Sequence, residues 1–118
     1  MQNFRNLDIW KHAHEIALDV YHISAKFPKE EQFGITSQLR RASTSIGANI
    51  AEGAGRRTDN DFRQFLYNAM GSLKECDNFL TLAKDLNYLP KSDYDMLAER
   101  IDHLGKMLTN FIKSINES

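Results

Sequence analysis

The feature that most constrains the fold is a repeat of apolar residues in the last part of the sequence. These side chains recur in alternating steps of three and four residues, as Tyr94, Leu97, Ile101, Leu104, Leu108, Phe111 and Ile115. Such spacing puts one apolar stripe along a helix and is typical of the seam between packed helices. The sequence therefore predicts a long last helix, with Ser92 as its N-cap, that packs against other helices.

Three more helices are predicted before this repeat. Only two prolines and six glycines interrupt the 118 residues, and the apolar residues between them keep helical rather than alternating spacing. Proline, glycine and capping residues set the expected bounds. These are Asn6 or Asp8 to just before Phe27, Thr36 or Ser37 to Glu52, and Thr58, Asp59 or Asn60 to before Pro90, with a short extra turn between Pro28 and Gly34.

The same spacing predicts which side chains of these three helices face inward. They are Trp10, Ala13, Ala17, Val20, Tyr21 and Ser24, then Leu39, Ala42, Ile46, Asn49 and Ile50, then Phe62, Phe65, Leu66, Ala69, Leu73, Cys76, Phe79, Leu80, Ala83 and Leu86. Connectors of a few residues make consecutive helices antiparallel. The predicted fold class is all-α, an antiparallel up-down-up-down four-helix bundle that residues 1–118 form as a single domain.

Charge and cysteine content limit the classes of function. The chain has 15 Lys and Arg against 16 Asp and Glu, a net charge of -1, so no overall excess of charge attracts nucleic acid or an anionic membrane. Its single cysteine, Cys76, has no partner for an internal disulfide and is expected to be a buried, inert thiol. The sequence lacks the apolar run of a signal peptide or a membrane span, so a cytoplasmic location is expected.

No catalytic, cofactor-binding or metal-binding site is predicted, and the chain is expected not to be an enzyme. His12 and His14 are two residues apart on a helix and therefore point to different sides, which prevents them from holding one metal ion. The glycine-rich segment from Glu52 to Thr58 resembles a phosphate-binding loop, but it follows a predicted helix rather than a strand. A helix C-terminus is the favoured interpretation of that segment.

The polar residues around the predicted second helix are the main candidates for a site. A buried amide or charge is costly unless it is paired, so a structural or assembly network is expected among Arg40, Arg41, Asn49, Glu52 and Glu75. Ligand binding by the same residues is the alternative. A second candidate is an arginine-rich strip that contacts nucleic-acid phosphates or pairs with acidic residues of another subunit. Its members are Arg40, Arg41, Arg56, Arg57 and Arg63.

Several segments together resemble one known family. They include Gln38-Leu39-Arg40-Arg41-Ala42, Asn49-Ile50-Ala51-Glu52-Gly53 and Gly71-Ser72-Leu73 with Glu75, besides Trp10, Phe27-Pro28, Phe33-Gly34 and Phe65-Leu66. The chain resembles the bacterial four-helix-bundle proteins encoded in intervening sequences of 23S ribosomal RNA genes. A related branch contains the accessory proteins of diversity-generating retroelements, which work with a reverse transcriptase and nucleic acid. The resemblance implies an antiparallel four-helix bundle that assembles as a ring-like homopentamer without an established enzymatic activity.

Two functions are therefore expected as alternatives. The first is a non-enzymatic homo-oligomer, a pentamer by resemblance, that acts as a scaffold or adaptor for a protein or nucleoprotein partner. The second is an RNA- or DNA-binding accessory module that uses the arginine-rich strip. The slightly acidic balance of the chain argues against strong binding of nucleic acid regardless of its sequence.

Overall fold

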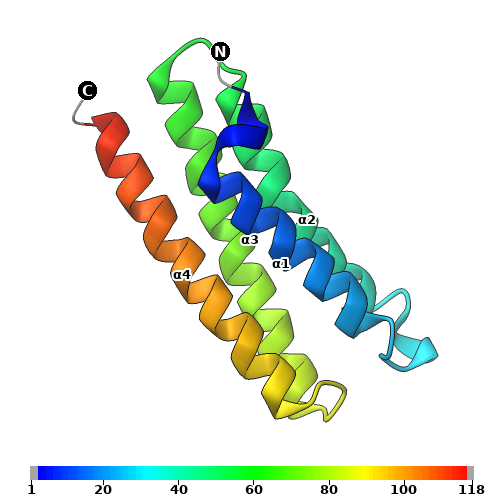
Figure 1. Ribbon diagram of the computed structural model, residues 1–118. Helices are drawn as coiled ribbons and strands as arrows, with labels where there is room; N and C mark the ends of the chain where they lie inside the picture. Colours follow the sequence, from blue (N-terminus) through cyan, green and yellow to red (C-terminus); the bar gives the residue numbers. More distant parts are fainter. Residues whose placement is uncertain (1–2, 117–118) are drawn as a thin grey trace.

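The computed structural model describes residues 3–116 and consists of helices joined by short connections (Figure 1). In chain order the elements are the 3-10 turn η1 (Phe4–Asn6), α1 (Asp8–Ser24), the 3-10 turn η2 (Lys29–Glu31), α2 (Ile35–Ala54), α3 (Asp59–Asp85) and α4 (Lys91–Asn116). The described residues contain no β-strand. The prediction of an all-α fold with four helices is confirmed.

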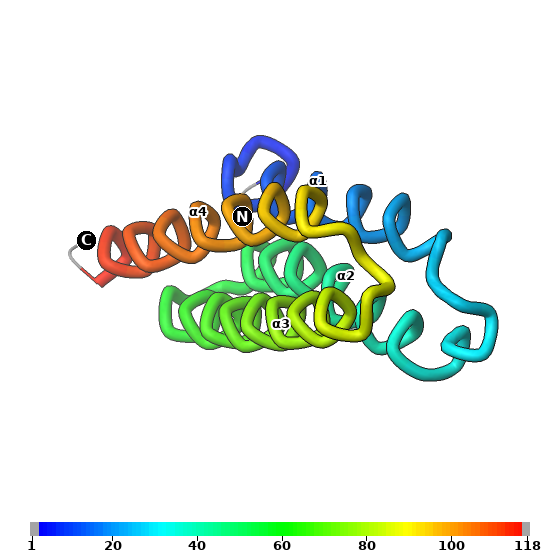
Figure 2. The backbone as a smooth tube through the Cα atoms, turned by 90° about the horizontal axis from the view of Figure 1, so that it is seen from below, coloured from blue at the N-terminus to red at the C-terminus, as the bar shows by residue number. Residues whose placement is uncertain are grey.

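The four helices surround one core. Each helix packs against the next in the chain, and α1 also packs against α4, so α2 and α4 lie diagonally across the bundle (Figure 2). The connections at residues 25–34 and 86–90 lie at one end of the molecule, which we call the two-loop end (Figure 1). The connection between α2 and α3 lies at the opposite end.

Side chains from both connections pack together at the two-loop end. The ring centres of Phe27 and Tyr88 are 5.9 Å apart, and the Tyr88 hydroxyl donates a hydrogen bond to Glu31 Oε2 at 3.0 Å. This hydrogen bond, with lesser contributions from burial and nearby carboxylates, raises the pKa of Tyr88. The contacts hold the two connections against each other.

The core differs from the predicted inward set mainly in the first and last helices. In α1 the buried apolar side chains include Ile9 and Ile16, whereas Trp10 is half-buried and Tyr21 is exposed. The sequence places two apolar stripes on this helix, and periodicity alone does not say which one faces the bundle. Leu86 at the end of α3, also predicted to face inward, is exposed as well.

In α4 the buried stripe drifts away from the predicted seam. It continues from Leu108 to Ile112, while Phe111 and Ile115 are only half-buried. A straight helix has 3.6 residues per turn, so a strict seven-residue repeat gradually rotates away from the core. Phe111 and Ile115 still pack against the core, and the ring centre of Phe111 lies 5.6 Å from that of Phe62. The predicted seam is therefore confirmed, with Ile112 as a further buried residue that the repeat does not include.

The predicted ends need two corrections. α2 continues through Gly53 to Ala54, because Gly53 is buried against α3 and takes part in the helix instead of ending it. The α4 helix begins at Lys91, and the backbone N–H of Tyr94 donates to the Pro90 carbonyl at 3.0 Å, so Ser92 lies inside the first turn and is not the N-cap. Thr58 is the N-cap of α3, where its hydroxyl accepts from the Asp61 N–H at 3.1 Å.

Candidate interaction surface

Arg40 is fixed against α1 by three contacts. Its Nε donates to Ser24 Oγ at 2.8 Å and its Nη2 to the Tyr21 carbonyl at 3.4 Å. The guanidinium carbon also lies 4.5 Å from the centre of the Tyr21 ring, a distance at which cation and ring attract each other. Arg40 therefore joins α2 to the end of α1 rather than to the acidic residues predicted as its partners.

The Arg40 contact gives a stability prediction for Ser24, which is buried. Ser24→Ala removes the acceptor of the Arg40 Nε and is expected to lower the free energy of unfolding by about 1 to 2 kcal/mol, because a hydrogen bond to a charged group is lost. Chemical denaturation measures this change. The exposed serine variant Ser114→Ala is the control, with an expected change within about 0.5 kcal/mol. Equal effects of the two substitutions would contradict a stabilising role for Arg40.

The other members of the predicted network lie on α2 and α3. Asn49 is half-buried, and its Nδ2 donates to the Ser45 carbonyl at 2.8 Å and to Ser45 Oγ at 3.2 Å. Glu75 lines the same open groove between α2 and α3, a hollow of ≈ 450 Å³. Arg41, Glu52 and Glu75 are exposed, and none of them forms an ion pair within residues 3–116. The structure thus brings Asn49 and Glu75 together but joins neither to the arginines.

We call this side of the molecule the α2/α3 face. It comprises the groove residues Asn49, Tyr67, Asn68, Gly71, Ser72 and Glu75, together with Leu82 and Leu86 further along the same exposed side of α3. On α3, Asn68, Ser72, Glu75, Leu82 and Leu86 are spaced by three, four or seven residues and form one stripe, which Tyr67 and Gly71 flank. This face combines polar groups at its centre with exposed leucines near the two-loop end.

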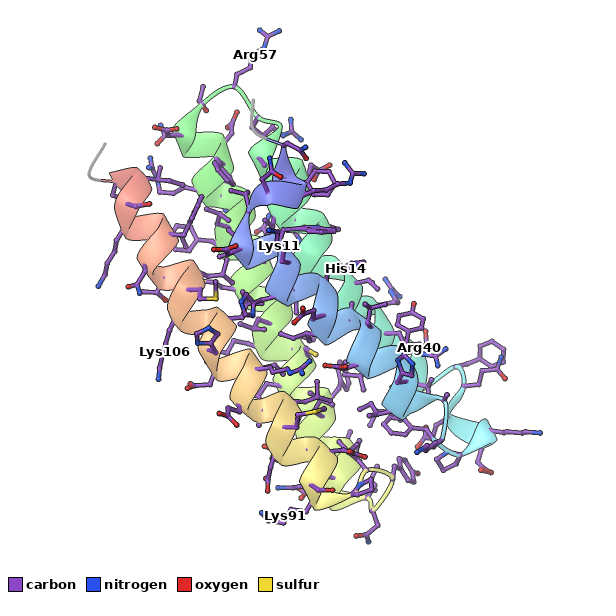
Figure 3. All side chains as sticks on the ribbon, viewed as in Figure 1. Lys11, His14, Arg40, Arg57, Lys91 and Lys106 are labelled. Carbon is purple, nitrogen blue, oxygen red and sulfur yellow. The ribbon has the colours of Figure 1, made fainter. Side chains whose placement is uncertain are left out.

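The five arginines of the predicted strip separate into two groups. Arg40 and Arg41 lie on α2 toward the two-loop end, while Arg57 projects from the opposite end of the molecule (Figure 3). Arg56 lies 4.7 Å from the centre of the Phe65 ring, and Arg63 donates to Asn60 Oδ1. Four turns of α2 separate the groups by about 20 Å.

The most prominent apolar surface was not predicted from the sequence. Leu18, Tyr21 and Phe33 expose 50%, 45% and 89% of their surfaces. Leu18 and Tyr21 border a mostly apolar hollow of ≈ 370 Å³ between α1 and α2, and Phe33 lines a neighbouring groove together with Tyr21. The hollow is lined by Trp10, Ala13, His14, Ala17, Leu18, Tyr21, Ser43, Thr44, Gly47 and Ala48. We call this side, including Phe33, Arg40 and Arg41, the α1/α2 face. The spacing of Trp10, His14, Leu18 and Tyr21, a second stripe along α1, is the signal that pointed to it.

Some ionisable groups outside these faces pair across α1 and α4. The ring centres of His12 on α1 and His103 on α4 are 5.2 Å apart, and Arg100 forms an ion pair with Asp19 across the same two helices. Among residues 3–116 no cluster of three or more potential ligands could hold a metal ion. Within that range, too, every helix is too short or too polar to cross a bilayer.

Two further sequence predictions concern Cys76 and the glycine-rich segment. Cys76 is fully buried, and burial, followed by the charges of Asp77 and Glu75, raises the pKa of its thiol to about 12. The N–H of Gly55 donates to the Glu52 carbonyl at 3.2 Å, so this segment ends a helix, as predicted, and that amide is already used.

The comparisons with known proteins identify the family. No curated protein matches the chain. A solved structure of a protein with unknown function from the S23 ribosomal protein family of Bacteroides thetaiotaomicron is similar to it, with 24% identity and a TM-score of 0.83 over 89% of this chain and 98% of the other. That likeness concerns the fold. The model of the 23S rRNA-intervening sequence protein family matches residues 5–110, and the chain therefore belongs to this family, as its sequence segments predicted.

Proposed function

We propose that this protein is a non-enzymatic scaffold or adaptor, an antiparallel up-down-up-down four-helix bundle that assembles with copies of itself. The number of copies that the resemblance implies is five. The observation that carries the proposal is the α1/α2 face, on which Leu18 and Tyr21 border an apolar hollow and Phe33 is exposed in the groove on the other side of Tyr21. Neighbouring exposed apolar side chains often mark the site where a protein binds a partner, whereas apolar residues scattered singly over a surface need no such explanation.

The residue types on the α1/α2 face support self-assembly. Aromatic residues and arginine are enriched at the centres of protein interfaces, and this face carries Tyr21, Phe33, Arg40 and Arg41 together. Arg40 and Tyr21 hold each other in place, so little side-chain entropy remains to be lost when a partner binds. Such preorganised anchors favour a specific contact.

The distribution of the arginines favours self-assembly over the alternative function in nucleic-acid binding. Of the five candidates, Arg40, Arg56 and Arg63 already contact other side chains of the chain, and the two groups lie at opposite ends of α2. A phosphate backbone is bound by several cations along one path, and its affinity grows with their number. Arg41 and Arg57 are too far apart to supply such a path.

The native mass of the protein tests the proposal. We expect the wild type to be a pentamer by light scattering at micromolar concentration and at both low and physiological salt. Phe33→Ser removes the most exposed of the large apolar side chains and is expected to weaken self-association at least tenfold, because truncating an aromatic hot spot costs about 2 kcal/mol or more. Met96→Ser, a substitution of an exposed apolar residue on α4, is the matched control and should leave the mass unchanged.

A monomeric wild type at every concentration would overturn the proposal. In that case a titration with single-stranded and structured RNA becomes informative. An affinity that falls steeply with added salt would support the nucleic-acid alternative, because phosphate contacts release counterions.

A further inference from the structure

We infer that His12 of α1 and His103 of α4 form a binding site for one divalent transition-metal ion, and that zinc is the ion that fits it. The inference does not depend on the proposed function, because it concerns the side of the bundle between α1 and α4 rather than the α1/α2 face. Its basis is the meeting of two imidazole rings, one from each helix, with their centres 5.2 Å apart. The imidazole of histidine is the commonest metal ligand in proteins.

The separation of the two rings matches zinc coordination. A tetrahedral zinc ion with zinc–nitrogen bonds of about 2.1 Å holds the centres of two imidazole ligands about 5.2 Å apart. An angle of about 90° between the ligands, as in square-planar or octahedral sites, would bring the ring centres to about 4.5 Å. The distance between His12 and His103 therefore favours a tetrahedral ion, and zinc prefers this geometry.

Both rings can direct a nitrogen toward a shared ion. Their planes are inclined by 65°, so that the edge of one ring meets the face of the other. The last torsion of a histidine side chain has a broad energy minimum, and His103 is exposed, so its ring is free to turn. The backbone of each residue is held by its helix. Binding of the ion therefore requires rotation of side chains and no change of fold.

The nitrogens of these two rings are available, unlike those of the other histidines. Within residues 3–116 neither His12 nor His103 takes part in a hydrogen bond or an ion pair. In contrast, His22 Nδ1 lies 2.9 Å from a carbonyl oxygen one turn earlier in α1, and the ring of His14 is stacked on Trp10. Of the four histidines of the chain, only His12 and His103 are both close together and free of such contacts.

Two carboxylates near the pair favour a cation. Glu15 follows His12 by three residues and Glu99 precedes His103 by four, so each carboxylate lies one helical turn from a histidine. Both are exposed, and neither forms an ion pair within the described part of the chain. Residues 3–116 contain no group of three side chains that could ligate one ion, so these carboxylates contribute charge, and water completes the tetrahedron.

The positive charges near the pair are largely countered. Arg100 forms an ion pair with Asp19, and Lys106 forms one with Asp102 at 3.2 Å. Lys11, labelled with Lys106 in Figure 3, precedes the first histidine, but residues adjacent in sequence point to different sides of a helix. An ion between the two rings is therefore not repelled by an unpaired cation on the same helix faces.

The site would join the first helix of the bundle to the last. The chain connects α1 to α4 only through α2 and α3, so side chains alone hold these two helices together. A metal bridge between residues about 90 positions apart in the sequence restricts the unfolded chain strongly, because the entropy of closing a loop grows with its length. Zinc is therefore expected to stabilise the bundle.

Titration of the protein with zinc, without a histidine tag, tests the inference. We expect calorimetry to show one zinc ion per chain, and the midpoint of thermal unfolding to rise with zinc concentration. His103→Ala and His12→Ala are each expected to lower the zinc affinity at least tenfold, because losing even a group that supports a ligand costs about 10-fold or more. The matched controls His14→Ala and His22→Ala should keep the wild-type affinity.

A second measurement uses the wild type alone and so does not depend on the folding of a variant. Diethylpyrocarbonate modifies free histidine nitrogens, and mass spectrometry identifies the modified residues. Zinc should protect His12 and His103 at concentrations that leave His14 reactive. The native mass should not change with zinc, because one chain supplies both ligands.

Three results would each overturn the inference. They are the absence of zinc binding up to millimolar concentration, equal protection of His12 and His14, and a native mass that increases with zinc. None of them bears on the proposed function, which the native mass without zinc tests.

Discussion

Native Cys76 is expected to react with iodoacetamide at least 1,000-fold more slowly than an exposed cysteine on the same helix. The reacting species is the thiolate. Burial, with a smaller contribution from neighbouring carboxylates, raises the pKa of the Cys76 thiol from 9.0 to about 12, which lowers the thiolate fraction at pH 8 by about 1,000-fold. Steric exclusion of the reagent adds to this effect, because Cys76 is fully buried.

The matched control places a cysteine at a position only two residues away. Asn78 is exposed on the same helix, so Asn78→Cys in a Cys76→Ala background keeps the local sequence while moving the thiol to the surface. Mass spectrometry of the alkylated protein measures both rates. Similar rates for the two thiols under native conditions would mean that Cys76 is not buried in the core.

The raised pKa of Cys76 also predicts a loss of stability at alkaline pH. The folded state favours the neutral thiol, because its pKa is higher there than in the unfolded state. Below about pH 9 the thiol is neutral in both states, so the pKa difference does not change the free energy of unfolding. As the pH rises from 9 toward 12, the unfolded state alone releases the proton, and the wild type is expected to lose about 4 kcal/mol relative to its stability at pH 8. Cys76→Ala should lack this component, so the two stability curves should diverge with pH.

The helices themselves could be predicted from the sequence because their breaks have local causes. Pro28, Thr58 and Pro90 restrict or cap the backbone at their own positions, and each lies at or near a boundary in the structure. The choice between two apolar stripes on α1 is not local. Ile16 and Tyr21 both continue a helical period, and only packing against α2 and α4 decides that Ile16 is buried and Tyr21 exposed.

The candidate site was less predictable for the same reason. Helical spacing indicates which helix carries Arg40, Asn49 and Glu75, but the partner of each side chain depends on the rotation of neighbouring helices. Arg40 turns toward Ser24 and Tyr21 of α1, and no pattern in the sequence favours these partners over Glu75. Phe33 was noticed only as part of a family segment, because an isolated aromatic residue in a connection carries no periodic signal.

Gly53→Ala is expected to lower the free energy of unfolding by about 2 kcal/mol, although alanine favours helices over glycine. An added Cβ at Gly53 would lie 2.7 Å from the Phe65 Cβ and 2.9 Å from Phe62 Cδ1. The Phe65 Cβ is fixed to the α3 backbone, so α2 and α3 must move apart to make room. Overpacking of this kind costs about 1 to 3 kcal/mol, more than the gain of up to about 1 kcal/mol from helix propensity.

Gly105→Ala on α4 is the matched control, because it changes the same group without the clash. Its nearest neighbour would be Leu73 Cδ2 at 3.6 Å, an ordinary van der Waals distance to the end of a flexible side chain. Helix propensity then dominates, and a gain of up to about 1 kcal/mol is expected. Chemical denaturation at one fixed protein concentration measures both variants, since self-association also affects apparent stability. If Gly53→Ala were as stabilising as Gly105→Ala, the close packing of α2 on α3 at this glycine would be wrong. A loss of stability for Gly53→Ala together with a gain for Gly105→Ala would establish that α2 needs glycine where it meets Phe62 and Phe65.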